Sequence, residues 1–184
     1  MTKKEIRDRV NERLTALSGE ECMEKSAAIL KRLGLRDEYL RAWKVALYAS
    51  GTREVITYPM IARSRQLDKG VAFPAITDRE KKEMVFRYVL SVSDLKCGTF
   101  GIPEPAENAT VMEQPDVVIV PLVAFDEKKN RIGHGMGYYD RYLAAHPDAF
   151  TIGLAFSCQR TDAIPAEPTD VALDLIITED TVYV

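Results

Sequence analysis

Three glycines alternate with other residues in one short segment of the chain. Gly133, Gly135 and Gly137 lie within residues 120–143, VPLVAFDEKKNRIGHGMGYYDRYL, and Arg131 comes shortly before them. Because glycine has no β-carbon, the backbone N–H groups of such a loop can turn toward an anion at little steric cost, and an arginine adds a fixed positive charge. The chemistry that these residue types can perform is phosphate binding.

The glycine pattern matches neither of two widespread phosphate-binding motifs. It lacks the Lys-Ser/Thr pair of the G-x-x-x-x-G-K-[ST] loop, and it is not the G-x-G-x-x-G dinucleotide fingerprint. A tight turn whose glycines only adopt positive φ is the favoured interpretation of an isolated G-x-G-x-G. The glycines alone therefore give a weak functional signal.

Two aspartates stand where carboxylates could assist a phosphate site. Asp140 follows the glycine segment at the start of an expected helix, and Asp174 lies beside an apolar run that predicts a strand. Carboxylates near bound phosphates commonly hold Mg²⁺, which takes one or two protein oxygens and keeps several waters. A helix N-terminal charge for Asp140 and a strand-edge charge for Asp174 explain the same residues as well. The residues alone leave both interpretations open.

Basic residues gather at the beginning of the chain, where Lys3, Lys4 and Arg7 fall within an expected helix. Lys3 and Arg7 are four positions apart and therefore share a helical face. Like charges on one face are mildly unfavourable unless an anion lies between them. Charges on an N-terminal helix are usually only solvated, and this is the favoured interpretation from the residues alone.

Helices and strands are expected to alternate along the chain. Two capping-box patterns, Thr2 with Glu5 and Ser18 with Glu21, precede apolar residues at helical spacing and predict two N-terminal helices. A further helix is expected over residues 54–67. The expected strands are short apolar or alternating runs at residues 44–50, 71–76, 83–90, 116–123, 150–156 and 173–178.

This alternation predicts a single three-layer α/β/α domain over residues 1–184, with a mainly parallel central sheet. In such sheets ligands bind beyond the carboxyl ends of the strands, where Ser50, Pro121 and the glycine segment should gather. Residues 97–114 show no clear period and carry Pro103 and Pro105. A long ordered loop of this kind is often part of a site or a lid.

Composition restricts the possible functions. With 184 residues, of which 46% are hydrophobic, the chain can bury one substantial core. The formal net charge of -3 argues against general nucleic-acid binding, which needs a basic excess on one face. Three widely spaced cysteines and two histidines argue against a zinc site or a disulfide framework. With no apolar leader and no run of ~20 apolar residues, we expect a cytoplasmic protein without a membrane partner.

The string R-I-G-H-G-M-G-Y-Y-D-R-Y-L, preceded by V-P-L-V-A-F-D, closely resembles the signature of the 5-formyltetrahydrofolate cyclo-ligase family. Four further segments match that family in the same order along nearly the entire chain: K-K-E-I-R, Y-A-S-G-T-R-E-V, F-G-I-P-E-P and P-x-E-x-x-D-V-A-L-D-L-I-I-T-E. The signature departs from the family at His134, where Tyr or Arg is frequent, and at Met136, where Gly or Lys is common.

This resemblance implies an enzyme that cyclises 5-formyltetrahydrofolate to 5,10-methenyltetrahydrofolate with release of ADP and phosphate from ATP. The formamide oxygen would attack the γ-phosphate to give an iminophosphate, N10 would add to the activated carbon, and phosphate would depart. Such a transfer needs positioning and charge neutralisation more than a protein nucleophile. The implied cofactor is Mg²⁺, the partners are the two small molecules, and a monomer is expected.

The resemblance also implies roles for individual residues. Arg131, Lys3 and Arg7 would serve catalysis by neutralising phosphate charge. Asp140 and Asp174 would hold Mg²⁺. The residues implied in ATP binding are Lys3, Lys4, Arg7, Arg131, Gly133, His134, Gly135, Met136, Gly137, Tyr138 and Tyr139. The residues implied in folate binding are Ala49, Glu54, Phe100, His134, Gly135, Met136, Gly137 and Tyr138.

The folate would need a flat, partly apolar wall, for which Tyr48, Ala49, Met84, Phe86 and Phe100 are candidates. For Met84 and Phe86 a position in the core explains the sequence at least as well. Phe100 lies in an expected loop and is the better candidate for stacking on a ligand.

Four polar or aromatic residues have two interpretations each. Glu54 would accept hydrogen bonds from the pterin, or it is the first-turn acid of the next helix. Tyr138 and Tyr139 should divide, one toward the ligand and one into the core, because adjacent residues entering a helix point in different directions. His134 would contact phosphate or folate, or it faces solvent.

Two other functional classes remain open. One is an enzyme on a similar α/β frame that acts on sugar phosphates or acyl-CoA thioesters and needs no adenine nucleotide. The other is a folate- or nucleotide-binding protein without catalysis. ATP turnover separates both from a cyclo-ligase.

Overall fold

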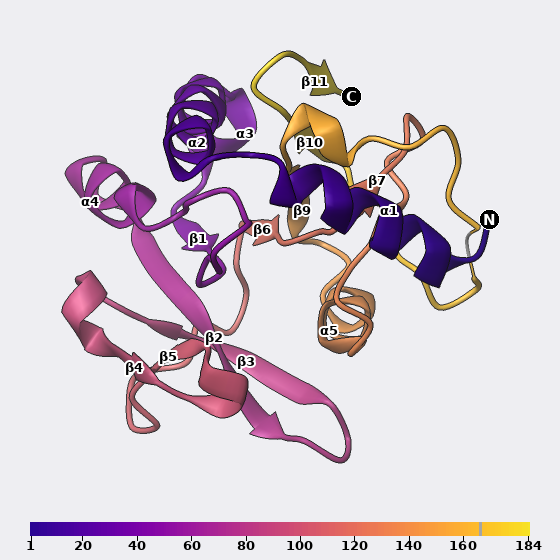
Figure 1. Cartoon of the computed structure of the whole chain (residues 1–184). Helices are drawn as coiled ribbons and strands as arrows, with labels where there is room; N and C mark the ends of the chain where they lie inside the picture. The colour runs from indigo at the N-terminus through magenta and orange to yellow at the C-terminus, as the bar shows by residue number, and fades with distance from the viewer. Residues whose placement is uncertain (166) are drawn as a thin grey trace.

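The computed structural model describes residues 1–165 and 167–184, and these form a central sheet with helices on both sides (Figure 1). The sheet has seven strands in the order β11-β10-β9-β6-β1-β2-β3. Its members are β1 (Lys44–Ala46), β2 (Gly70–Asp78), β3 (Glu83–Tyr88), β6 (Val117–Val120), β9 (Phe150–Leu154), β10 (Leu175–Ile177) and β11 (Val182–Tyr183). The strands from β10 to β2 run parallel, and the edge strands β3 and β11 are antiparallel to their neighbours.

The two N-terminal helices begin where the sequence predicts their caps. They are α1 (Lys3–Thr15), α2 (Gly19–Leu33), α3 (Asp37–Arg41), α4 (Pro59–Gln66) and α5 (Tyr138–Ala145). At α1 the Glu5 N–H donates to Thr2 Oγ1 and the Thr2 N–H donates to Glu5 Oε2, and Ser18 and Glu21 repeat this exchange at α2. Both capping boxes are confirmed.

Alternate side chains of the strands divide the core into two layers. Val45, Ile119 and Ile152 pack in a cluster with buried residues of α1, α2 and α4. Ala46 and Val118, one position along the same strands, pack with buried residues of α5 on the opposite face. Because side chains of a strand point alternately to either face, short apolar runs cover both layers at once. The three-layer α/β/α arrangement with a mainly parallel sheet is confirmed.

Two predicted segments differ in the structure. The helix expected over residues 54–67 begins only at Pro59, because residues before it bond instead to Tyr48, just after β1. Thr57 Oγ1 donates to the Tyr48 carbonyl, and Tyr48 Oη donates to the Val55 carbonyl. Glu54 therefore lies in a turn and not in a helix. Proline at the first helical position lacks only a donor that would be unpaired anyway.

The segment expected as a loop over residues 97–114 contains a strand, β5 (Pro103–Pro105), which pairs antiparallel with β4 (Leu95–Cys97) just before it. Prolines can occupy a strand whose N–H side is not used by a neighbour, so they did not exclude pairing here. The pair lies beside β2 and β3 (Figure 1) and is joined by the 3-10 turn η2 (Thr99–Gly101). Most predicted strands are also shorter than expected; β1, for example, ends at Ala46 and not at residue 50.

A short hairpin, absent from the sequence-based prediction, precedes the glycine segment. It consists of β7 (Ala124–Phe125) and β8 (Arg131–Ile132). Buried Asp126 holds its turn by accepting hydrogen bonds from the N–H groups of Lys128, Asn130 and Ile164. The hairpin thereby fixes the start of the glycine segment. Within the described ranges, every helix is too short or too polar to cross a membrane.

Candidate active site

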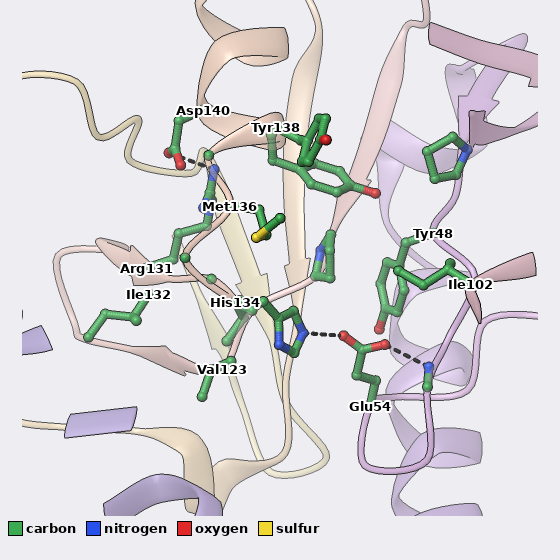
Figure 2. Close-up of a pocket in the computed structure, with 18 of the residues that line it drawn as sticks. Tyr48, Glu54, Ile102, Val123, Arg131, Ile132, His134, Met136, Tyr138 and Asp140 are labelled. Carbon is green, nitrogen blue, oxygen red and sulfur yellow. Dashed lines mark hydrogen bonds and ion pairs between the residues drawn. The ribbon is translucent and has the colours of Figure 1, made fainter. Parts of the chain in front are cut away.

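A cavity of about 1200 Å³ opens at the carboxyl ends of β1 and β6 (Figure 2). It is lined by residues that follow these strands, by one face of α1, by β2 and β3, by η2, by the glycine segment and the start of α5, and by residues 167–171. Ser50, Pro121 and the glycine segment do meet there, as the parallel sheet predicts. Segments from most of the chain's length therefore form one site.

The glycine segment wraps around the beginning of α5. Gly135 and Gly137 have φ of 91° and 77°, and Gly137 is the N-cap of the helix. Such values favour glycine, and the N-terminus of a helix carries unpaired N–H groups and a partial positive charge. Arg7 of α1 is tied to this loop, because its Nε donates to the Gly133 carbonyl at 2.9 Å. The loop therefore places the N-terminus of a helix beside a guanidinium.

Arg131 lies almost completely inside the protein, with 3% of its side chain exposed. Its Nη2 donates to Asp140 Oδ1 at 2.8 Å, whereas its buried Nε has no hydrogen-bond partner among the described residues. Burial lowers the pKa of this guanidinium and the charge of Asp140 opposes that shift. A buried cation with an unused donor at the wall of a cavity is suited to an anionic ligand.

Lys3 pairs with two carboxylates of the segment that precedes β10. Its Nζ lies 2.6 Å from Asp170 Oδ2 and 3.2 Å from Glu167 Oε1. Desolvation lowers the pKa of Lys3, but the hydrogen bonds to Asp170 and Glu167 outweigh it, so the pKa lies above its usual value. For Asp170, desolvation alone would raise the pKa, but the hydrogen bond to Lys3 lowers it below its usual value. Lys4, in contrast, is exposed and does not line the cavity.

The two aspartates expected to hold a metal are not brought together. Asp140 lines the cavity, but Asp174 does not. Asp174 Oδ2 accepts hydrogen bonds from the N–H and Oγ1 of Thr151, near the amino end of β9. Asp174 therefore lies away from the cavity, because the start of β10 is at the opposite end of the sheet from the glycine segment.

Asp170 is a cavity-lining carboxylate that the sequence-based prediction did not single out. It lines the cavity with Asp140, and the Val171 N–H next to it donates to Asp140 Oδ1 at 3.4 Å. Its only signal in the sequence is its place in the P-x-E-x-x-D segment. Among the residues that the structure describes, no three His, Cys, Asp or Glu side chains form a metal-binding group. Mg²⁺ needs only one or two carboxylates, so this does not argue against it.

Glu54 has both carboxylate oxygens engaged at the cavity wall. Oε2 accepts from the Gly51 N–H at 2.7 Å, and Oε1 lies 2.9 Å from His134 Nε2 (Figure 2). The hydrogen bond to Glu54 raises the pKa of His134 above its usual value, while burial and the charge of Arg7 oppose the shift. The glycine segment and the turn after β1 are thus joined by one ion pair.

An apolar wall faces this ion pair. Tyr48, Ala49 and Met84 line the cavity and are at least 90% buried. Phe100 also lines it, is 56% exposed and has a φ of 58°, with the Arg79 guanidinium 5.4 Å from its ring centre. Phe86 does not line the cavity and packs edge-on against Tyr139 and Tyr142, so the core interpretation holds for it.

Tyr138 and Tyr139 do not divide between ligand and core as expected. Both line the cavity, and both contact the hydrophobic cluster beneath α5. Their hydroxyl groups are buried and have no hydrogen-bond partner within residues 1–165 and 167–184. Because an unpaired buried hydroxyl is unfavourable, these groups are candidates for bonds to a ligand or water. Gly133 and Met136 also line the cavity.

The model of the 5-formyltetrahydrofolate cyclo-ligase family matches residues 1–179 of the chain. The 5-formyltetrahydrofolate cyclo-ligase of Haemophilus influenzae is 34% identical over 146 residues, which cover 76% of this chain and 78% of that protein. The Escherichia coli K12 protein of the same name is 29% identical over 179 residues, covering 95% and 98% of the two chains.

Two solved structures share the fold. The NMR structure of Aquifex aeolicus 5,10-methenyltetrahydrofolate synthetase has a TM-score of 0.87 and 32% identity, covering 99% of this chain and 92% of that one. The 5,10-methenyltetrahydrofolate synthetase of Mycoplasma pneumoniae has a TM-score of 0.78 and 27% identity, covering 97% and 99%.

Proposed function

The chain belongs to the 5-formyltetrahydrofolate cyclo-ligase family of enzymes, and we propose that it converts 5-formyltetrahydrofolate to 5,10-methenyltetrahydrofolate at the expense of ATP, releasing ADP and phosphate. The observation that carries this proposal is one cavity with two chemically different halves. The first half presents the glycine segment with Arg131 and Arg7, and the second presents an apolar and aromatic wall around Glu54.

The cationic half suits the triphosphate. Arg131 is fixed by Asp140, Arg7 is fixed by the Gly133 carbonyl, and Lys3 is fixed by Asp170, so three positive charges are held before a ligand arrives. Charges held in place need no reorganisation during the reaction and stabilise a transition state more than mobile ones. We assign ATP to this half of the cavity.

The apolar half suits a folate. Tyr48, Met84 and Phe100 offer flat or apolar surface for the pterin and aminobenzoyl groups, and Glu54 offers carboxylate oxygens to the pterin N–H groups. Because the glycine segment borders both halves, the formyl group and the γ-phosphate would meet beside it. Residues close to that junction include His134, Met136 and Tyr138.

The reaction then requires no protein nucleophile. The formyl oxygen attacks the γ-phosphorus, the bond to ADP breaks, and the phosphorylated formyl group is an iminophosphate. N10 adds to the formyl carbon and loses its proton, the carbon–oxygen bond breaks, and phosphate leaves with the former formyl oxygen. Arg131, Arg7 and Lys3 neutralise the charge that develops on the transferred group.

Mg²⁺ is a further part of this proposal, with Asp140 and Asp170 as the residues that would hold it. Both line the cavity beside the buried guanidinium of Arg131, which has an unused donor. When bound, Mg²⁺ would neutralise part of the triphosphate charge and orient it. Asp174, turned toward Thr151, has no place in this set.

Replacing Asp170 with asparagine should raise the Mg²⁺ concentration for half-maximal turnover by roughly 10-fold or more, because a charged oxygen ligand is lost. Asp174→Asn is the matched control and should leave the Mg²⁺ requirement unchanged, with at most a loss of stability of about 1 kcal/mol from its bonds to Thr151. Mg²⁺ titrations of turnover measure this. Equal Mg²⁺ dependence of the Asp170 variant and the wild type would assign Asp170 a purely structural role.

The proposed function is tested by following methenyltetrahydrofolate absorbance with and without ATP, together with ADP release. We expect product formation only with ATP, and one ADP for each product. An enzyme for sugar phosphates or thioesters would form no product under these conditions. A binding protein would retain both ligands without releasing ADP.

A further inference from the structure

One ion pair joins the two halves of the cavity. His134 extends from the glycine segment, and Glu54 extends from the turn after β1; Nε2 and Oε1 are 2.9 Å apart although 80 positions separate the residues (Figure 2). The side chain of Glu54 is 18% exposed and that of His134 is 62% exposed. The contact therefore bridges the cavity at its accessible side.

Each partner of this pair is a group that one substrate would need. This step rests on the proposed function. The carboxylate of Glu54 has one oxygen on the Gly51 N–H and the other on His134, so a pterin N–H would compete with His134 for the second oxygen. His134 is the single titratable side chain among residues 133–137, and it lies between Gly133 and Gly135, whose amides would bind phosphate in the proposed function.

We propose that His134 couples the binding of the two substrates, because the His134–Glu54 contact has to open for either of them. The free energy needed to open the pair lowers the affinity for whichever substrate binds first. The second substrate then binds without this penalty. Such coupling is positive and reciprocal: ATP strengthens folate binding by the same factor by which folate strengthens ATP binding.

The size of the coupling follows from the exposure of the pair. Ion pairs at exposed positions contribute modestly because water and salt screen them. Because His134 is mostly exposed, we expect the binding of one substrate to lower the dissociation constant of the other by about two- to five-fold. The hydrogen bond to Glu54 raises the pKa of His134 above its usual value, and burial and the charge of Arg7 oppose this shift.

The experiment measures the dissociation constant of 5-formyltetrahydrofolate alone and with saturating Mg²⁺ and β,γ-imido-ATP, which blocks phosphoryl transfer. The wild type should bind the folate about two- to five-fold more tightly with the nucleotide analogue. His134→Asn should bind the folate alone more tightly by a similar factor and should show no further gain from the analogue. The reverse titration should give the same coupling factor in the wild type.

His146→Asn is the matched control, because His146 stacks on Tyr142 and does not line the cavity. It should retain the coupling of the wild type. Equal coupling in the wild type and in His134→Asn, or weaker binding of folate alone by His134→Asn, would overturn the role of His134 while leaving the proposed function intact. Failure of the wild type to bind either ligand would overturn both.

Discussion

Replacing Arg131 with methionine is expected to lower the turnover of ATP and folate by about 10³-fold, because cations of this kind contribute factors of 10³ to 10⁵ in phosphoryl transfer. Arg131 is the most buried of the three cations in the cationic half, and it is held by Asp140. Methionine keeps much of the buried stem but supplies no charge and no N–H donor. Steady-state rates at varied ATP concentration measure the loss.

Arg131→Lys is the control for charge without the planar guanidinium. It should recover part of the lost turnover but not all of it, because an ammonium cannot contact Asp140 and a phosphate with the same geometry. The methionine variant should remain folded, with a loss of about 1–3 kcal/mol because Asp140 loses its partner but stays partly exposed. A folded Arg131→Met protein with normal turnover would show that phosphate is bound elsewhere.

Replacing Gly135 with valine should reduce turnover by about 100-fold or more while the protein still folds. Gly135 has a φ of 91°, which a β-branched residue adopts only with strain of about 1–3 kcal/mol. Its new β-carbon would also stand 3.4 Å from Arg7 Nη2. A loop that shifts to relieve this strain loses its alignment with phosphate. A displacement of positioning groups by about 1 Å can lower rates 10²-fold.

Gly19→Val is the matched control for the added side chain. Gly19 is the first residue of α2, and a β-carbon there would meet no heavy atom within 4 Å. It should leave turnover unchanged. The melting temperature of Gly135→Val should fall by no more than roughly 10 °C, since the loop is exposed and contributes little to the core. Full activity in a folded Gly135→Val protein would show that the loop is only a turn and does not bind phosphate.

The parts of the fold that depend on neighbours in sequence are predictable from the chain. Thr2 and Ser18 form their capping boxes with residues three positions away, so both helix starts are visible as short patterns. The buried parallel strands are visible as apolar runs such as that around β6. Their exact ends are not, because pairing with neighbouring strands decides where a ladder stops.

The turn that carries Glu54 shows why a helical pattern can fail. Residues 54–67 are typical of one helix, but the hydroxyl groups of Thr57 and Tyr48 form hydrogen bonds that join this stretch to the segment just after β1. These partners are seven to nine positions apart in the chain. A helix-period pattern records only contacts within a helix, so this competition was not visible in it.

The sequence by itself was enough to identify the glycine segment, with Arg131 before it and Asp140 after it at the start of a helix. These residues lie close together in the chain and form one family signature. Only the tertiary structure decided which second aspartate reaches the cavity. Asp170 and Asp174 are four positions apart in one segment. Asp170 lies outside any helix or strand, so no helical or strand periodicity predicts where its side chain points.

The tertiary structure also decided the partner of His134. Nothing local to either residue indicates that His134 and Glu54 touch, because one follows β8 and the other follows β1. Parallel strands bring their carboxyl ends to one edge of the sheet, and both segments reach the same cavity because Glu54 follows β1 whereas the β7-β8 hairpin that carries His134 follows β6. The contact itself depends on how far each loop extends over that edge, and this is set by packing between distant parts of the chain and not by the residues that form the pair.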